Sequence, residues 1–289
     1  MVARMKRMTP ALLVWMLLAL TVCGCRDRGA GDRAPTTVES TDLRTVAGDA
    51  DMRPAADGKP PEPGQPPVEA PAKITVVPES ARSLAAAAAV MPKLAPRLAA
   101  MGLTLGAPAF VRIFKEEHEL EVWLLKGGAY ERFDTWKIAY YSGDLGPKMI
   151  VGDRQAPEGF YFVPPGMLRP TSSYHLAFNI GYPNAFDRAH GRTGSLIMVH
   201  GSNVSIGCFA MTDPGIEEIY TLVSAALQAG QPFFRVHVFP FRMTDANLKA
   251  HRLSPHRAFW LNLKEGYDLF EKHRRPPEVS VRNRRYVFR

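Results

Sequence analysis

Met198-Val-His-Gly-Ser-Asn-Val-Ser-Ile-Gly-Cys208 is the stretch on which the predicted fold and chemistry of this chain depend. The apolar run Leu196–Val199 leads into His200 and is typical of a strand. Gly201 and Gly207 then punctuate a short loop that ends at Cys208. The stretch therefore predicts a strand followed by a tight loop, with a histidine at one end of the loop and a cysteine at the other.

This pairing of residue types favours covalent chemistry. A cysteine nucleophile needs a base that takes the thiol proton, and it needs backbone N–H groups that hold an oxyanion. His200 can supply the base, and the loop before Cys208 can supply the N–H groups. The sequence thus predicts a cysteine acyl-transfer site.

The chain has three cysteines, and the first two lie in what looks like an export signal. Met5-Lys6-Arg7 is basic, and the apolar run 11–22 that follows is shorter than the ~20 residues of a membrane-spanning helix. Val22-Cys23-Gly24-Cys25 resembles a lipoprotein signal-peptidase site, since small Gly24 precedes Cys25. We expect cleavage before Cys25 and lipidation of Cys25; an ordinary secretory signal cut a few residues later is the alternative.

If Cys25 is lipidated, Cys208 is the one unmodified cysteine of an exported protein. Oxidising compartments favour paired cysteines, so an unpaired thiol calls for a reason. A buried, inert Cys208 is one interpretation. The neighbouring Gly207 indicates a turn rather than a packed core position, which favours a nucleophile.

Composition divides the chain into four parts. Residues 1–24 are a lipoprotein-type signal peptide, and 25–72 are a Pro/Gly/Ala-rich tether with too few aromatic residues to fold. Residues 73–102 are Ala-rich and partly helical, interrupted by prolines, and form either an appendage helix or more tether. Aromatic residues concentrate after residue 110, so one catalytic domain is expected over 103–289.

The formal net charge of +8 suits an anionic partner. Export removes nucleic acid as a natural partner, which leaves an anionic wall polymer or lipid surface, or a solvated surface with no specific partner. Part of the charge sits at the C-terminal end, where four arginines cluster: Arg282, Arg284, Arg285 and Arg289.

Strand-like segments dominate the chain between residues 110 and 239. Alternating or apolar runs predict strands over 110–114, 119–124, 159–163, 174–180, 195–200 and 233–239, and a pair of strands within 130–141. Two helices are expected, over 216–227 and 258–272. The first should have Thr212 or Asp213 as its N-cap and Pro214 at its first position. Mostly antiparallel strands with few helices predict a mainly β (α+β) fold, a β-sandwich or barrel with helical insertions.

Four motifs together resemble the YkuD-type L,D-transpeptidase catalytic domain: Gly152-Asp-Arg-Gln-Ala-Pro-Glu-Gly-Phe-Tyr, Gly181-Tyr-Pro-Asn, Asp187, and His200-Gly…Ser205-Ile-Gly-Cys208. The similarity is greatest to the murein L,D-transpeptidase/amidase branch of Gram-negative bacteria and covers about residues 103–289. It implies a β-sandwich-like domain with the cysteine at one end of a sheet. The substrates it implies are peptidoglycan stem peptides that carry meso-diaminopimelate.

The resemblance assigns roles by position. Cys208 matches the family's nucleophile, His200 its base and proton donor, Gly207 the oxyanion region and Ser205 a supporting residue. Backbone N–H groups near Gly207 and Cys208 would hold the oxyanion, and the carbonyl of Gly201 or Ser202 would orient the His200 ring. Ile206 replaces the histidine of the common Ser-His-Gly-Cys motif, and the eight-residue spacing from His200 to Cys208 is shorter than in most of the family.

Other polar residues have two interpretations each. Arg192 could clamp a substrate carboxylate or pair with Asp187. Tyr182 and Asn184 are expected either to shape the cleft wall through a turn or to bind substrate directly. Two carboxylates, Asp153 and Glu158, are expected to stiffen a hairpin, and two histidines, His175 and His237, to be satisfied sheet residues. No cysteine–histidine cluster has zinc spacing, and no phosphate or dinucleotide motif occurs, so no metal or cofactor is expected.

Three functions follow. The first is a transpeptidase that crosslinks stem peptides or attaches a protein lysine to them. The second is an amidase that releases a peptidoglycan-attached lipoprotein. The third is an inactive wall-binding lipoprotein. In each case the protein is expected in the periplasm, held to a membrane by a lipid; Arg26 after Cys25 favours the outer membrane.

Overall fold

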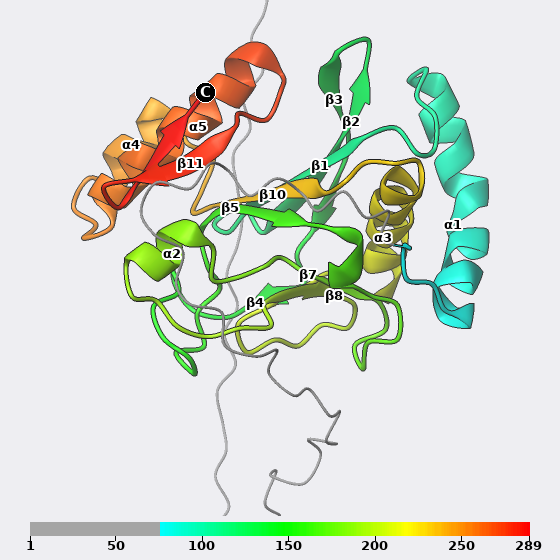
Figure 1. The fold of residues 1–289 in the computed structure, drawn as a ribbon, viewed down its shortest axis with the longest axis horizontal. Coiled ribbons are helices and arrows are strands. Elements are labelled where there is room, and N and C mark those ends of the chain that lie inside the picture. Colours follow the sequence, from blue (N-terminus) through cyan, green and yellow to red (C-terminus); the bar gives the residue numbers. More distant parts are fainter. Residues whose placement is uncertain (1–75) are drawn as a thin grey trace, which may run out of the picture. The chain divides into compact units, whose positions relative to one another are not determined.

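The computed structural model describes residues 76–289 (Figure 1). The predicted signal peptide (1–24), its lipidation site and the predicted tether (25–72) lie outside the described residues. The fold is built from two five-stranded sheets, five α-helices and a C-terminal hairpin within the described part of the chain. The expected mainly β (α+β) class is confirmed.

The first sheet has the strand order β3-β2-β1-β10-β5. Its strands are β1 (Ala109–Phe114), β2 (Glu119–Lys126), β3 (Ala129–Lys137), β5 (Gly159–Val163) and β10 (Phe234–Phe239). Strand β1 pairs with β10 in parallel, whereas the other pairs of this sheet are antiparallel. The expectation of mostly antiparallel strands is confirmed, with two parallel pairs as exceptions, one in each sheet.

The second sheet has the order β4-β9-β8-β7-β6 and carries the His200–Cys208 stretch. Its strands are short: β4 (Tyr140–Tyr141), β6 (Leu168–Arg169), β7 (Ala177–Asn179), β8 (Met198–His200) and β9 (Phe209–Ala210). A single 3-10 turn, Pro165–Met167, precedes β6. Strands β8 and β9 are parallel, so the loop between them returns the chain to the same edge of the sheet.

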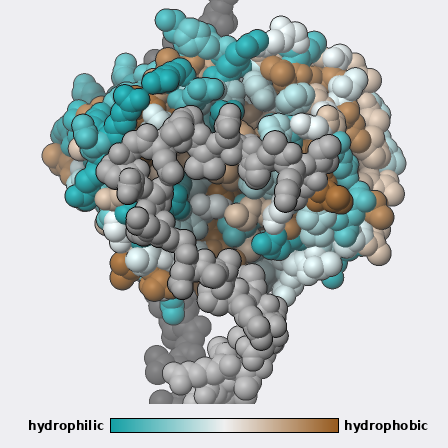
Figure 2. Space-filling model, viewed as in Figure 1, coloured by the Kyte–Doolittle hydropathy of each residue, from teal (hydrophilic) through white to brown (hydrophobic). Residues whose placement is uncertain are grey.

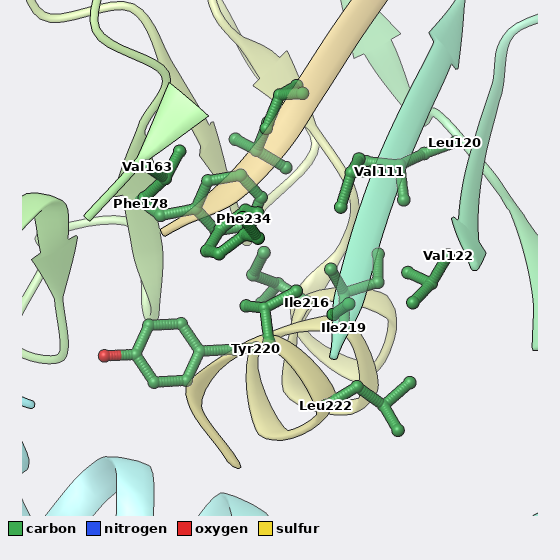
Figure 3. Close-up of a cluster of buried hydrophobic side chains, with 14 of the residues drawn as sticks. Val111, Leu120, Val122, Val163, Phe178, Ile216, Ile219, Tyr220, Leu222 and Phe234 are labelled. Atoms are coloured by element: carbon green, nitrogen blue, oxygen red, sulfur yellow. The ribbon is translucent and has the colours of Figure 1, made fainter. Parts of the chain in front are cut away.

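Helix α3 (Asp213–Gln228) packs between the two sheets, and its buried side chains join both sheets in one core. Figure 3 shows its Ile216, Ile219 and Tyr220 directed into the cluster that contains Phe178 of β7 and Val111 of β1. The helix begins at its N-cap Thr212, whose hydroxyl accepts from the N–H of Gly215, 3.4 Å away. This confirms the first N-cap alternative, and Pro214 lies at the second helical position rather than the first.

The other face of the first sheet is covered by the C-terminal part of the chain. Helix α5 (Arg257–His273) brings Trp260, Leu263 and Tyr267 against this face, together with α4 (Asp245–Ala250) and the hairpin β11 (Val279–Arg282) and β12 (Arg285–Phe288). Because β1 alternates, Val111 and Ile113 enter the core with α3, whereas Phe110 and Phe114 face α5.

Helix α1 (Ala81–Ala100) differs from the sequence expectation. It is one continuous helix whose Ala86, Val90, Leu94 and Leu98 are buried in the same core as α3. Pro92 and Pro96 lie on its exposed face, where water can reach the carbonyls that the two prolines leave without a helical donor. Residues 81–100 are thus neither tether nor appendage, and the packed body begins before the expected boundary at residue 103.

Strand bounds also differ near the second sheet. The segment expected as a strand over 174–180 is a strand only at β7, because the chain turns at His175, whose φ is +68°. Helix α2 (Ala185–Ala189), helix α4 and the β11–β12 hairpin were not expected. They are short or rich in charged residues, so their hydrophobic periodicity is weak.

The described surface is hydrophilic over α4, α5 and β11, at the upper left of Figure 2. Exposed cations there include Lys249, Arg252, Arg282, Arg284 and Arg285. Within residues 76–289, no helix combines the length and the apolar character needed to cross a membrane.

Candidate active site

His200 ends strand β8 and is held in one tautomer. Its side chain is buried, and Nδ1 lies 2.6 Å from the carbonyl oxygen of Gly201. A carbonyl only accepts hydrogen bonds, so Nδ1 carries the proton and Nε2 carries the free lone pair. The expectation that the Gly201 carbonyl orients this ring is confirmed.

Cys208 comes directly before β9 and is partly buried. The backbone N–H of Met198 donates to its sulfur over 3.3 Å, and the thiol lies 3.6 Å from the carbonyl oxygen of Leu196. A backbone N–H that points at the sulfur stabilises the thiolate. The structure thus places Cys208 against the start of β8.

The parallel pairing brings the two side chains to one face. Val199 pairs with Phe209 and His200 with Ala210, and both Val199 and Phe209 are fully buried in the core. Side chains alternate along a strand, so His200 and Cys208 both point to the opposite face, two residues apart along adjacent chains. The loop 201–207 is what makes this juxtaposition possible.

Ser205 organises the last turn of the loop. Its Oγ accepts from the N–H of Cys208 (2.7 Å) and of Gly207 (3.2 Å) and donates to the carbonyl of Cys208 (2.8 Å). The two N–H groups expected to hold an oxyanion are therefore occupied by Ser205 in this structure. A substrate oxygen would have to compete with the Ser205 hydroxyl for them, whereas the Met198 N–H already faces the sulfur.

Burial shifts the two reactive groups in opposite senses. Desolvation lowers the pKa of His200 from its usual value, and the hydrogen bond to Gly201 offsets this in part. Desolvation raises the pKa of the Cys208 thiol, opposed by the Met198 N–H and the Lys148 ammonium. At neutral pH the resting pair is therefore a neutral imidazole and a neutral thiol.

Lys148 is a functional candidate that the sequence analysis missed. Its ammonium lies near enough to Cys208 to lower the thiol pKa, and it donates to the carbonyl of Ile150 over 2.9 Å and pairs with Asp153. Its side chain is only 5% exposed. A lone lysine far from the motif gives no sequence pattern, so only the fold reveals it.

Tyr174 is a second residue that the sequence did not single out. Its ring centroid lies 4.8 Å from that of His200, with the planes tilted by 39°. The tyrosine side chain is 49% exposed, whereas His200 is 3% exposed. Tyr174 therefore lies between the imidazole and solvent.

The three residues predicted to bind substrate all make contacts within the protein that stabilise the fold. Tyr182 is buried and donates to the carbonyl of Lys148 over 3.1 Å, so it shapes the wall. Asn184 caps α2 and donates to the carbonyl of Phe160, 2.9 Å away. Arg192 is 5% exposed and pairs with Asp187 at 2.8 Å, which is the second of its two interpretations. The peptide bond between Tyr182 and Pro183 is cis.

The remaining polar candidates are structural as well. Asp153 accepts from the N–H groups of a tight turn, those of Met149 (2.8 Å) and Ile150 (3.0 Å). Glu158 is fully buried and accepts from Lys115 and Trp260. His237 lies on β10 in the core, as expected, but its Nε2 is buried without a hydrogen-bond partner among the described residues, so the expectation that this histidine is satisfied is wrong.

His175 is not a sheet residue: it turns before β7 and bonds Glu217 at 2.8 Å. This corrects the sequence expectation. The turn at His175 makes the strand begin later than the apolar pattern indicated, at Ala177.

Exposed apolar side chains lie on the loops that border the site. They are Met149, Ile150, Val151, Tyr174, Leu196, Val204 and Ile206, with exposures from 46% to 82%. The loop with Met149 and Val151 is tied to Thr193 through two hydrogen bonds. Exposed apolar residues around a polar reaction centre are typical of a binding rim.

Among residues 76–289, no group of three or more His, Cys, Asp or Glu side chains could hold a metal ion.

Relatives of known name support a family assignment. No family model matches the chain. Two curated proteins, "Putative L,D-transpeptidase YafK" of Escherichia coli K12 and of Escherichia coli O157:H7, are 53% identical over 183 residues, 63% of this chain and 74% of each relative.

Two solved structures show weaker similarity. The helical cell shape determining protein Pgp2 of Campylobacter jejuni has a TM-score of 0.37 and 17% identity, over 65% of this chain and 79% of its own. Bd1075 of Bdellovibrio bacteriovorus has a TM-score of 0.35 and 16% identity, over 61% and 78%. No residue of the site is assigned from these two. By its identity to the curated relatives, the chain belongs to the L,D-transpeptidase-like family.

Proposed function

We propose that this protein is a cysteine acyltransferase of the L,D-transpeptidase type that acts on peptidoglycan stem peptides. The observation that carries the proposal is the pair of His200, at the end of β8, and Cys208, directly before β9. His200 has its Nε2 lone pair free and points to the same face as Cys208. The murein L,D-transpeptidase/amidase branch of the family is the one to which we assign it.

In the first half-reaction, Nε2 of His200 takes the thiol proton as the Cys208 sulfur attacks the carbonyl carbon at the L-centre of diaminopimelate. The carbon–sulfur bond forms and the amide carbon–nitrogen bond breaks. His200 then returns the proton to the departing amine. Because burial disfavours the charged form of both groups, the proton transfer that we propose accompanies the attack.

In the second half-reaction, an acceptor attacks the thioester and regenerates the thiol. An amine acceptor completes a transpeptidation, and water completes a hydrolysis. In both cases His200 removes a proton from the acceptor and Cys208 leaves as the thiol. The acceptor alone decides which product forms.

An amidase is the second candidate, and one residue favours it. Ile206 stands where the common motif has a histidine, and its side chain is 82% exposed. The loop therefore offers no second imidazole to activate an amine acceptor, so water can take its place. The amide cleaved would then join diaminopimelate to a peptidoglycan-attached lipoprotein.

The test uses the purified full-length chain with muropeptides and with muropeptides that carry a lysine peptide on diaminopimelate. Products are read by mass spectrometry, with Cys208→Ala as the matched control. New 3–3 crosslinks or D-amino-acid exchange would support the transpeptidase, and released lysine peptide without crosslinks the amidase. If the wild-type chain and Cys208→Ala behave alike and both bind the wall, the inactive wall-binding lipoprotein is the better description.

We also propose that the protein is held in the periplasm by a lipid on Cys25, at the outer membrane. The support is the Val22-Cys23-Gly24-Cys25 sequence and Arg26 after it. Cys25→Ser should abolish incorporation of labelled palmitate and release the protein from membrane fractions. Equal labelling of the variant and the wild type would exclude this anchor.

A further inference from the structure

The segment 171–176 lies over the base and has little secondary structure of its own. It enters from β6, turns at His175 and becomes β7 only at Ala177. Tyr174, at its centre, packs against His200 with ring centroids 4.8 Å apart and the ring planes tilted by 39°. A half-exposed side chain on an irregular segment needs external contacts to keep such a position.

Helix α1 supplies contacts on one side of the segment. Nη1 of Arg82 donates to two carbonyls of it, those of Ser172 (2.7 Å) and His175 (2.8 Å). Ser80, the N-cap of α1, donates from Oγ to the carbonyl of Pro170 over 2.9 Å. The first turn of α1 therefore holds the backbone on both sides of Tyr174 by hydrogen bonds.

Helix α3 and Gly201 hold the other side. Nε2 of His175 bonds Oε1 of Glu217 at 2.8 Å, and the N–H of Gly201 donates to the carbonyl of Tyr174 over 3.0 Å. A Cβ on Gly201 would lie 2.8 Å from the Tyr174 carbonyl oxygen and 2.9 Å from Cβ of His175. The glycine after His200 is thus what lets the segment approach the base so closely.

From these contacts we propose that Tyr174 is a positioning residue for His200, and that Arg82 of α1 keeps it in place. The inference rests on the proposed function, because it assumes that His200 is the base. The Gly201 carbonyl fixes one edge of the imidazole, and the tyrosine ring fixes its plane. Tyr174 also keeps water from the imidazole, so Nε2 stays neutral and available to the thiol.

The titratable groups around His200 come from three other elements. Cys208 precedes β9, and Asp213 at the start of α3 accepts from the N–H of Ser202 over 2.7 Å. The His175–Glu217 pair links the segment to α3. Burial, rather than a neighbouring charge, is the cause that lowers the pKa of His200. Removing the Tyr174 side chain should therefore raise the pKa of His200.

The experiment uses the full-length chain with four substitutions: Tyr174→Phe, Tyr174→Ala, Arg82→Gln and, as a matched control, Arg252→Gln. Arg252 is an exposed arginine on the loop after α4, away from this segment. The first readout needs no substrate. Alkylation of the Cys208 peptide by iodoacetamide is followed by mass spectrometry at pH 7 and at pH 10, and the ratio of the two rates corrects for access to the sulfur.

A rise of half a unit in the pKa of His200 makes imidazolium about threefold more abundant at pH 7. Since imidazolium promotes thiolate, the pH 7 to pH 10 ratio should rise by about threefold in Tyr174→Ala. Arg82→Gln should raise this ratio by a smaller factor. Tyr174→Phe and Arg252→Gln should leave the ratio unchanged. Turnover should change in the opposite direction: kcat of Tyr174→Ala falls with KM little altered, and the acid limb of kcat/KM moves to higher pH.

An unchanged alkylation ratio in both Tyr174→Ala and Arg82→Gln would overturn the proposal. So would a rise in KM alone, which would make Tyr174 a substrate contact. If Tyr174→Ala does not fold, Arg82→Gln, which removes only a surface side chain, decides the matter. A wild-type chain without turnover would overturn the proposed function, whereas the alkylation ratios would still report on Tyr174 and Arg82.

Discussion

Burial shifts the pKa of a side chain in a direction that depends on whether its ionised form is a cation or an anion. The same dry environment lowers the pKa of His200 and raises that of Cys208, because each charged form loses hydration. The Met198 N–H and the Lys148 ammonium oppose the effect on the sulfur. Burial thus reinforces the neutral state that the ordinary pKa values of histidine and cysteine already favour near pH 7.

Ser205→Ala should lower kcat/KM by about 10- to 100-fold, because the turn that positions Cys208 loses the hydroxyl that holds it in place, a loss of ~1–3 kcal/mol. Ser205→Thr keeps a hydroxyl and should retain most of the activity. Steady-state kinetics on muropeptides provide the measurement. Ser195→Ala, at an exposed serine before β8, is the control. Activity of Ser205→Ala within twofold of the wild type would contradict this role.

The hydrogen-bond partner of a residue could be predicted from the sequence only where the two residues lie close together along the chain. The contact of His200 with Gly201 is between neighbours, so it could be predicted. The partners of Asn184 and Tyr182 lie 24 or more residues away, at Phe160 and Lys148, and no local pattern reveals them. Arg192 had a partner five residues away, which is why its pairing was one of two alternatives.

At the scale of elements, one buried ammonium holds the long loop beside the site. Nζ of Lys115 donates to the carbonyls of Asp144 (2.8 Å), Gly146 (2.9 Å) and Ala156 (3.0 Å), and to Glu158 at 3.1 Å. The loop carries Lys148 between these anchors. Its conformation thus depends on an ion pair with both side chains fully buried.

Lys115→Met should reduce the free energy of unfolding by about 3–5 kcal/mol, because Glu158 is left as an unpaired buried charge. Adding Glu158→Gln should recover part of the loss, and urea denaturation of the single and double variants measures the coupling. Lys137→Met is the matched control, since that lysine is 74% exposed and its surface pair is worth at most ~1 kcal/mol. A simple sum of the two single effects would mean that the pair is not coupled.

Helix α1 should contribute to stability as a part of the core. Leu94 is fully buried and Leu84, on the same helix, is 55% exposed. We expect Leu94→Ala to cost about 2–5 kcal/mol of unfolding free energy and Leu84→Ala no more than ~0.5 kcal/mol. Thermal or urea unfolding distinguishes them. Equal small effects of the two substitutions would show that the packing of α1 contributes little to the free energy of unfolding.

The elements themselves were predictable where their patterns were long. The helix over 216–227 and the strands of the first sheet have strong periodicity, and the structure confirms them. Helix α1 was underestimated, because Pro92 and Pro96 suggested breaks, whereas both lie on the solvent face four residues apart. Strands β8 and β9 are short, and their parallel pairing is set by the loop between them.

For the molecule as a whole, two buried histidines should make stability depend on pH. Burial lowers the pKa of His237 well below its usual value, and that of His200 also falls. Above pH ~6.5 neither the folded nor the unfolded chain protonates them, so they add no pH dependence. Below it the unfolded chain binds the protons first, so stability falls by up to ~1.4 kcal/mol per pH unit for each histidine.

His237→Leu should therefore flatten the loss of stability between pH 6.5 and pH 5. The imidazole lies between Phe110 and Phe160, and its Nε2 is buried with no hydrogen-bond partner among the described residues. A leucine of similar size keeps the packing and cannot bind a proton. Urea unfolding of this variant and the wild type at pH 8 and at pH 5 gives the comparison. An unchanged difference between the two pH values would rule out His237 as a source of acid sensitivity.

The protonated resting state of Cys208 also bears on how long the protein survives. Peroxides and disulfides react with thiolates far faster than with thiols. A sulfur whose pKa is raised by burial is therefore a poor target for such oxidants, although it is a nucleophile whenever His200 takes its proton. The partly buried position of Cys208 should therefore slow its irreversible oxidation between turnovers.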